Sequence, residues 1–209
     1  SELYTENKAK LLDLYHKLMK YMFIIATPIV VGCVIFSRDI IYIIYGANYL
    51  DGAVSLSILI WAGIFLFLSN ISTTLLGAIN KQFMATKMAA IGATFSVILN
   101  IILIHFYSYI GASISTVCTE ALILFLMIYA LSKTEFKLDW RRLAGPFIKV
   151  VVANIIMVVV IYALNLGFII TVPIAAVTYL LALFITGSID KDDRLMIYGF
   201  IKDMKNSKS

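Results

Sequence analysis

One acidic residue, Glu120, lies where a carboxyl group could do chemistry within an apolar segment. It sits near the middle of the run from 110 to 131 and is flanked on both sides by apolar or small residues. A charge at membrane depth is costly, so such residues usually face a helix-bundle interior or a wet cavity. Two interpretations follow: an acid that contacts substrate or binds a coupling proton or cation, and a structural hydrogen bond to a neighbouring helix.

Other small and polar residues recur at helical spacing in the same region. Small residues at every fourth position let helix backbones approach, and polar side chains then bond across the contact. The same stripes could instead line a common polar cleft, and the sequence leaves both interpretations open. Our candidates for a substrate or ion cleft are Glu120, Asn100, Thr116, Asn70, Thr73 and Asn80. Gly92 and Ser96 precede Asn100 at this spacing, and Ala112 precedes Thr116.

Motifs typical of enzymes are missing from the sequence. It has no Walker A loop, HExxH, paired CxxC or GxSxG, so an ATP-driven mechanism within this chain is disfavoured. Cys33 and Cys118 stand inside apolar runs, and we expect both to be buried small hydrophobic residues. We therefore expect no catalytic residue, no metal site and no cofactor, and a protein that is not an enzyme.

The elements that must position these residues are six apolar runs. Hydrophobic residues make up 62% of the 209 residues and charged residues 14%, which is far from the roughly 25% charged residues of a soluble domain. A spanning helix needs roughly 17 to 25 apolar residues. The runs are 21–37, 53–79, 88–104, 110–131, 147–164 and 166–186. We expect an all-α fold, a polytopic transmembrane helix bundle with six spans.

The basic residues predict how these spans are oriented. With six crossings, sixteen of the 17 Lys and Arg residues fall on one face and only Arg38 falls on the other. Such residues mark the cytoplasmic side, so the positive charge reflects topology and we expect no nucleic-acid partner. Both ends should be cytoplasmic. The expected parts are a cytoplasmic or interfacial lead-in at 1–20, four spans at 21–132, a basic cytoplasmic loop at 133–146, two terminal spans at 147–187 and a cytoplasmic tail at 188–209.

Three sequence segments carry a family resemblance. They are IIYGANY at 43–49, LLGAINKQ at 75–82, and LNIILI at 99–104 followed by YIGASIST at 109–116 and Glu120. These segments resemble motifs of the polysaccharide-lipid flippases, which belong to the multidrug/oligosaccharidyl-lipid/polysaccharide superfamily. The resemblance runs from about residue 11 to residue 131, and the last two spans match only in number and length. Two departures fall in the outer turn, where His105 replaces a frequent Pro and Ser108 a frequent Gly.

The resemblance implies two six-helix lobes around a central cleft, with this chain as the C-terminal half of a two-lobe transporter. It implies flipping of lipid-linked oligosaccharide across the cytoplasmic membrane by alternating access, for cell-surface polysaccharide biosynthesis. The implied partners are membrane lipid, the lipid-linked oligosaccharide and an N-terminal lobe of the same protein. Alternatives are a drug/cation antiporter or a peptidoglycan-precursor flippase of the same superfamily. A membrane-embedded enzyme of glycan assembly is disfavoured because the outer joints are short.

Overall fold

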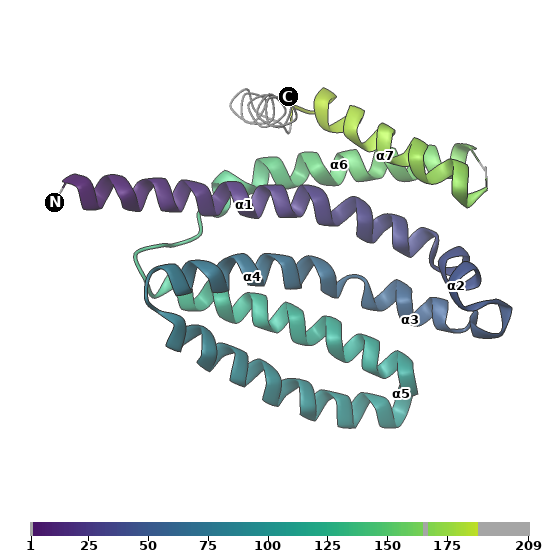
Figure 1. Cartoon of the computed structure of the whole chain (residues 1–209), viewed down its shortest axis with the longest axis horizontal. Helices are drawn as coiled ribbons and strands as arrows, with labels where there is room; N and C mark the ends of the chain where they lie inside the picture. The colour runs from purple at the N-terminus through teal and green to yellow at the C-terminus, as the bar shows by residue number, and fades with distance from the viewer. Residues whose placement is uncertain (1, 165–166, 188–209) are drawn as a thin grey trace, which may run out of the picture. The chain divides into compact units, whose positions relative to one another are not determined.

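The computed structural model describes residues 2–164 and 167–187, which form helices joined by short turns (Figure 1). The described residues contain no β-strand, so the prediction of an all-α polytopic membrane bundle is confirmed. The expected tail at 188–209 lies outside the described residues. The helices are α1 (Glu2–Ile35), α2 (Ser37–Tyr45), the 3-10 turn η1 (Ala47–Tyr49), α3 (Gly52–Leu59), α4 (Ala62–Ala78), α5 (Gln82–Ser132), α6 (Trp140–Leu164) and α7 (Phe168–Ile185).

Six membrane crossings arise from these helices. Five apolar stretches of the described residues are long enough to span a bilayer, and α3 with α4 makes one of them. Helix α5 has 51 residues. At about 1.5 Å per residue it would exceed twice the roughly 30 Å of hydrocarbon if it were straight. Its backbone breaks at Ser108, where φ is 52° and ψ is −133°. The chain reverses there, so α5 supplies two antiparallel spans (Figure 1).

Two glycines let the arms of this α5 hairpin pack closely. A Cβ atom on Gly111 would lie 2.0 Å from the Leu103 carbonyl oxygen, which is backbone and cannot rotate away. Further from the turn, a Cβ atom on Gly92 would meet the Ile123 side chain at 2.5 Å. The absence of a side chain at these positions is therefore what allows the turn at Ser108 to be so short.

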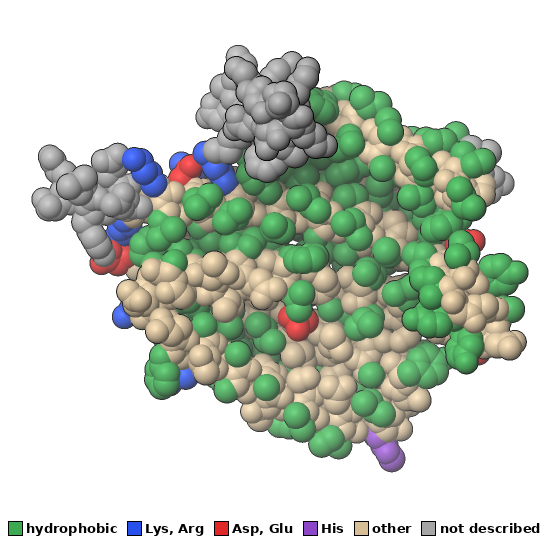
Figure 2. All heavy atoms as spheres, in the orientation of Figure 1, with side chains coloured by type: hydrophobic (Ala, Val, Ile, Leu, Met, Phe, Trp, Pro, Cys, Tyr) green, Lys and Arg blue, Asp and Glu red, His purple; other side chains and the backbone are tan. Residues whose placement is uncertain are grey.

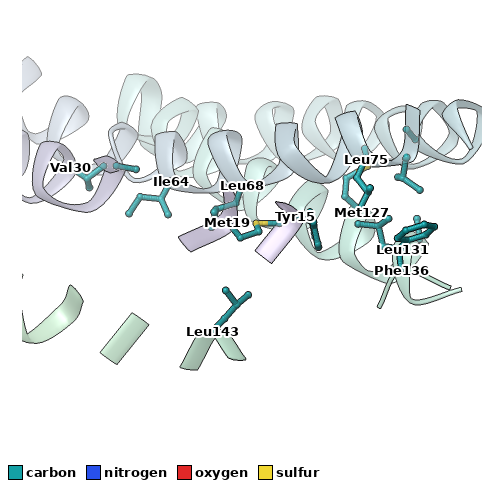
Figure 3. Close-up of a cluster of buried hydrophobic side chains, with 14 residues drawn as sticks. Tyr15, Met19, Val30, Ile64, Leu68, Leu75, Met127, Leu131, Phe136 and Leu143 are labelled. Carbon is teal, nitrogen blue, oxygen red and sulfur yellow. The ribbon is translucent and has the colours of Figure 1, made fainter. Parts of the chain in front are cut away.

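The chain forms two compact units, 1–147 and 148–209. The core of the first unit is a cluster that α1, α4 and the second arm of α5 share. Tyr15 and Met19 of α1 meet Leu68 of α4 there, together with Met127 and Leu131 of α5 (Figure 3). Because Tyr15 and Met19 belong to this core, the second half of the expected lead-in at 1–20 packs as part of the bundle. Helix α1 runs through it unbroken into the first span.

The surface of the molecule carries many large apolar side chains. Ile101, Phe106, Phe125, Ile169 and Ile185 are each more than 65% exposed, and apolar side chains spread over the face in Figure 2. An exposed apolar surface of this extent is typical of lipid contact. Cys118 is also exposed and Cys33 is partly exposed, so the expectation that both are buried is wrong. The reason is that lipid-facing positions in a membrane helix are as apolar as core positions.

In the first unit, basic side chains gather where α1 begins and where α4 turns into α5 (Figure 2). We call this the lysine-rich end, and we call the opposite end, where α1 meets α2, the Arg38 end. In the second unit, α6 and α7 are antiparallel. The ammonium of Lys149, near the start of α6, donates a hydrogen bond of 3.0 Å to the carbonyl of Gly187, just after α7.

Candidate functional site

The six candidate cleft residues are distributed over α4 and α5 in the first unit. Asn70 and Thr73 lie on α4, and Asn80 lies in the turn before α5. Asn100 lies on the first arm of α5, while Thr116 and Glu120 lie on the second. Asn70 lines one of three cavities in the first unit, and the other five residues line none of these three.

Asn70 lines a groove of about 330 Å³ between α1 and α4. The other lining residues are almost all apolar, among them Leu14, Leu18 and Phe67, and Thr74 adds a hydroxyl. Asn70 is exposed, so its amide can reach a ligand that enters the groove. The groove thus combines an apolar wall with one amide and one hydroxyl, as many small-molecule sites do.

Asn100, Thr116 and Thr73 bond back to their own helices. The Asn100 amide donates to the carbonyl of Ser96 at 2.9 Å, and the Thr116 hydroxyl donates to the carbonyl of Ala112 at 3.0 Å. Thr73 does the same with Ser69. These bonds use donor hydrogens and leave the side-chain oxygens of Asn100 and Thr116 able to accept further bonds. Each of these three bonds stays within a single helix.

Asn80 has a structural reason for its position. Its φ of 58° lies in the left-handed region, which Asn tolerates better than most residues. The next amide, of Lys81, donates to the carbonyl of Leu76 at 2.7 Å, which closes the C-terminal end of α4. Asn80 therefore shapes the turn at the lysine-rich end, whatever else its exposed side chain does.

Glu120 is half-buried on the second arm of α5. Its carboxyl group has no ion-pair or hydrogen-bond partner among the residues that the structure describes. The structural interpretation, a hydrogen bond to Ser or Thr of a neighbouring helix, therefore has no contact to support it within this chain. A carboxyl group that is free within a span can bind a proton, a cation or a hydroxyl of a substrate.

The most buried polar residues are ones that the sequence reasoning missed. On the second arm of α5 the buried stripe is Gly111, Ser115 and Thr119, one position before the expected stripe of Ala112, Thr116 and Glu120. The hydroxyls of Ser115 and Thr119 are buried without a hydrogen-bond partner. The spacing alone could not choose between the two stripes, because both contain small residues at every fourth position.

Polar contacts between helices involve residues outside the predicted stripes. The Tyr15 hydroxyl of α1 and the Ser72 hydroxyl of α4 are 3.0 Å apart. Ser55 of α3 and Ser113 of α5 also share a hydrogen bond. These contacts join α1 to α4 and α3 to α5.

At the lysine-rich end, α1 binds the segment between α5 and α6. Buried His16 contacts the carbonyl of Leu12 through Nδ1 at 2.7 Å and accepts the backbone N–H of Asp139 through Nε2 at 2.9 Å. These two partners assign the proton to Nδ1, so the ring is neutral. The Lys8 ammonium also pairs with Glu135. Their hydrogen bond and opposite charges lower the pKa of the exposed Glu135 carboxyl.

Metal ligation is not indicated by the described residues, among which no three His, Cys, Asp or Glu side chains cluster. The structure thus presents a groove with Asn70, a free carboxyl at Glu120 and acceptor oxygens at Asn100 and Thr116, all within membrane-spanning helices.

Comparison with known proteins places this arrangement among membrane proteins. No model of a known protein family matches the chain. The chain is 34% identical, over 134 residues, to the uncharacterized membrane protein MJ1068 of Methanocaldococcus jannaschii, a match that covers 64% of this chain and 26% of the relative. It also resembles a solved structure of the lipid II flippase MurJ in an inward closed conformation. The TM-score is 0.70 and the identity 22%, over 86% of this chain and 40% of MurJ.

The chain and part of MurJ share one fold. This chain spans about a quarter of the curated relative and 40% of MurJ. Together with the apolar helices, these similarities establish a multi-pass membrane protein.

Proposed function

We propose that this chain is the C-terminal part of a flippase that moves lipid-linked oligosaccharide across the cytoplasmic membrane for cell-surface polysaccharide biosynthesis. The observation that carries the proposal is the fold shared with a lipid II flippase over most of the chain. The sequence motifs of 43–49, 75–82 and 99–116 support it independently. An N-terminal lobe of the same protein would complete a central cleft, and the transporter would work by alternating access.

The substrate's chemistry explains why polar groups lie in such apolar helices. A sugar headgroup cannot leave water for hydrocarbon unless its hydroxyls find hydrogen-bond partners, whereas its lipid tail can remain in the bilayer. Glu120 can accept from such hydroxyls, or bind the cation or proton whose movement drives transport. The free oxygens of Asn100 and Thr116 can accept further hydrogen bonds. Asn70 supplies an amide at the groove between α1 and α4.

The proposed orientation puts the lysine-rich end in the cytoplasm, because basic residues concentrate on that side of a membrane. The segment 133–146 is then a cytoplasmic loop and 147–187 holds the two terminal spans. Both ends of this chain are cytoplasmic in this arrangement.

Substitution of Glu120 in the full-length protein tests the transport proposal. We expect Glu120→Ala and Glu120→Gln to lower surface polysaccharide by at least about tenfold, equivalent to roughly 1.4 kcal/mol of activation free energy, while lipid-linked repeat units accumulate inside. Thr94→Val is a matched control for Thr116→Val. Thr94 makes the same bond to its own helix but is exposed, so only Thr116→Val should reduce export. Unchanged surface polysaccharide in both Glu120 variants would remove Glu120 from the site.

A peptidoglycan-precursor flippase is the second candidate, because the solved protein of the same fold acts on lipid II. Expression of the full-length protein in cells depleted of their own lipid II flippase separates the two candidates. Restored growth would favour the peptidoglycan precursor. If the depleted cells still lyse, the protein does not replace their lipid II flippase. Restored polysaccharide export in cells that lack an oligosaccharide flippase would then favour the lipid-linked oligosaccharide.

A further inference from the structure

An open cavity of about 480 Å³ lies at the Arg38 end of the first unit. It forms where α1 ends and where α2 and α3 begin, and Tyr109 of the α5 hairpin also lines it. Its polar lining consists of Ser37, Arg38, Asp51, Ser57 and Tyr109. None of the six candidate cleft residues touches it.

Three side chains in this cavity have no partner in the described part of the chain. The Arg38 guanidinium and the Asp51 carboxylate are exposed, and neither makes an ion pair or a side-chain hydrogen bond. The Ser37 hydroxyl also lacks a partner, although Ser37 is only 7% exposed. Ser37 lines the cavity, so a ligand in the cavity can accept a hydrogen bond from this hydroxyl.

Two helices begin at the cavity. Ser37 opens α2 and Gly52 opens α3, and neither helix has a side-chain cap on its first N–H groups. In α3 the Ala53 N–H donates instead to the Leu50 carbonyl, so the remaining N–H groups are the ones available to a ligand. Helix N-termini carry partial positive charge and favour anions. These N–H groups, the Arg38 guanidinium and the Ser37 hydroxyl are all donors, so most of the cavity favours an anion. Asp51 is the exception, since its carboxylate can only accept hydrogen bonds.

The cavity also lies at the level of lipid headgroups. It stands at the end of the span that α1 makes, and the tyrosines Tyr42, Tyr45 and Tyr49 next to it are each more than 55% exposed. Exposed tyrosines of this kind are typical of the boundary between hydrocarbon and water. The anions present at that depth are lipid phosphates.

We propose that this cavity binds the phosphate group of a lipid headgroup. Arg38 donates to two phosphate oxygens at once, as guanidinium groups commonly do, and Ser37 donates to a third. Asp51 accepts from a hydroxyl or ammonium elsewhere on the same headgroup. The phosphate belongs either to bulk phospholipid or to the diphosphate of a polyprenyl carrier. The inference does not depend on the proposed flippase function, because it uses none of the cleft residues.

Native mass spectrometry of the full-length protein in detergent tests the proposal, with phosphatidylglycerol, polyprenyl diphosphate and diacylglycerol as probes. Phosphatidylglycerol should bind, and diacylglycerol, which lacks phosphate, should bind at least about tenfold more weakly. Arg38→Ala should weaken phosphatidylglycerol binding by a similar factor, and Ser37→Ala by less. Arg141→Ala removes an exposed arginine from the lysine-rich end and should change the affinity less than about twofold.

The outcomes separate the two sources of phosphate. Tighter binding of polyprenyl diphosphate than of phosphatidylglycerol, lost in Arg38→Ala, identifies the carrier lipid. Equal or weaker binding identifies bulk phospholipid. Equal affinity for diacylglycerol, or full phosphatidylglycerol affinity in Arg38→Ala, would overturn the proposal. Arg38 is exposed, so its replacement should not disturb the fold, and an unchanged thermal midpoint in detergent checks this.

Discussion

The Cα atom of Gly111 lies so close to the Leu103 carbonyl that a Cβ atom there would stand 2.0 Å from its oxygen. The two residues are on opposite arms of the α5 hairpin, so this contact sets how tightly the third and fourth spans turn. The neighbouring break at Ser108 has a positive φ. The hairpin therefore depends on two backbone features that no side-chain contact can replace.

Gly111→Ala should destabilise the protein strongly. The added methyl group would force backbone apart, and we expect a loss of at least about 2 kcal/mol of unfolding free energy. Gly77→Ala is the matched control, because a Cβ atom at Gly77 meets nothing within 4 Å. Denaturation by SDS from mild detergent micelles measures both. Equal stability of the two variants would contradict the close approach at Leu103.

Ser108→Gly should stabilise the protein. Glycine adopts φ of 52° and ψ of −133° without the strain that serine bears, and the expected gain is about 1 kcal/mol. Ala93→Gly serves as the control, because Ala93 lies within a regular, exposed part of α5 and should lose about 1 kcal/mol. A lower thermal midpoint for Ser108→Gly than for the unsubstituted protein would show that Ser108 has an ordinary helical backbone.

The six spans could be predicted from the sequence because hydrophobic length and the distribution of basic residues are independent signals. Both indicated a turn between residues 104 and 110, and the structure breaks α5 at Ser108. The rotation of each helix about its axis could not be predicted. In water a polar face fixes that rotation, whereas lipid leaves both faces apolar. This is why the buried stripe at Ser115 and Thr119 was missed in favour of Thr116 and Glu120.

The contacts of residues 8–20 were missed for a different reason. Their polar sequence suggested an interfacial segment, yet Tyr15 and His16 are buried through contacts with residues far along the chain, Ser72 and Asp139. No local pattern in a sequence reveals such long-range partners. The six candidate residues could be chosen from their types and spacing. The groove that Asn70 lines could not, because it depends on how α1 packs against α4.

His16→Ala should destabilise the contact between α1 and the segment before α6. The backbone N–H of Asp139 would lose its acceptor. Because Asp139 is itself exposed, the expected cost is about 0.5 to 1.5 kcal/mol. His16→Phe keeps an aromatic ring but lacks the nitrogen atoms, so it should also destabilise this contact. Hydrogen exchange at the Asp139 amide measures the effect directly. Unchanged protection in both variants would mean that Nε2 does not hold this amide.

The Lys8–Glu135 pair predicts a dependence of stability on pH. The pKa of Glu135 is lower in the folded state than its ordinary value of 4.5. A lowered carboxyl pKa stabilises the fold above the unfolded-state pKa, and the stabilisation is lost as pH falls through the folded-state pKa. Glu135→Gln should therefore lower the thermal midpoint slightly at pH 7 and in low salt. The difference from the unsubstituted protein should vanish once the pH falls below the folded-state pKa of Glu135. A difference that persists in acid would contradict the pairing.

Labelling from outside intact cells tests the proposed orientation. After Cys33 and Cys118 are replaced by Ala, a single cysteine at Tyr45 should react with a membrane-impermeant maleimide, because it lies at the Arg38 end. A single cysteine at Lys137, in the segment between α5 and α6, should react only after the cells are opened. The reverse pattern would invert the topology.

The shortness of the α5 turn also constrains how the protein is made. With the chain reversing at Ser108, no stretch of polar residues separates the third span from the fourth. The second arm follows the first directly after the turn at Ser108, so the two arms enter the bilayer in close succession. The two arms must therefore leave the insertion machinery side by side, as a preformed pair. A glycosylation tag or epitope placed at this turn would interrupt biogenesis before it altered transport.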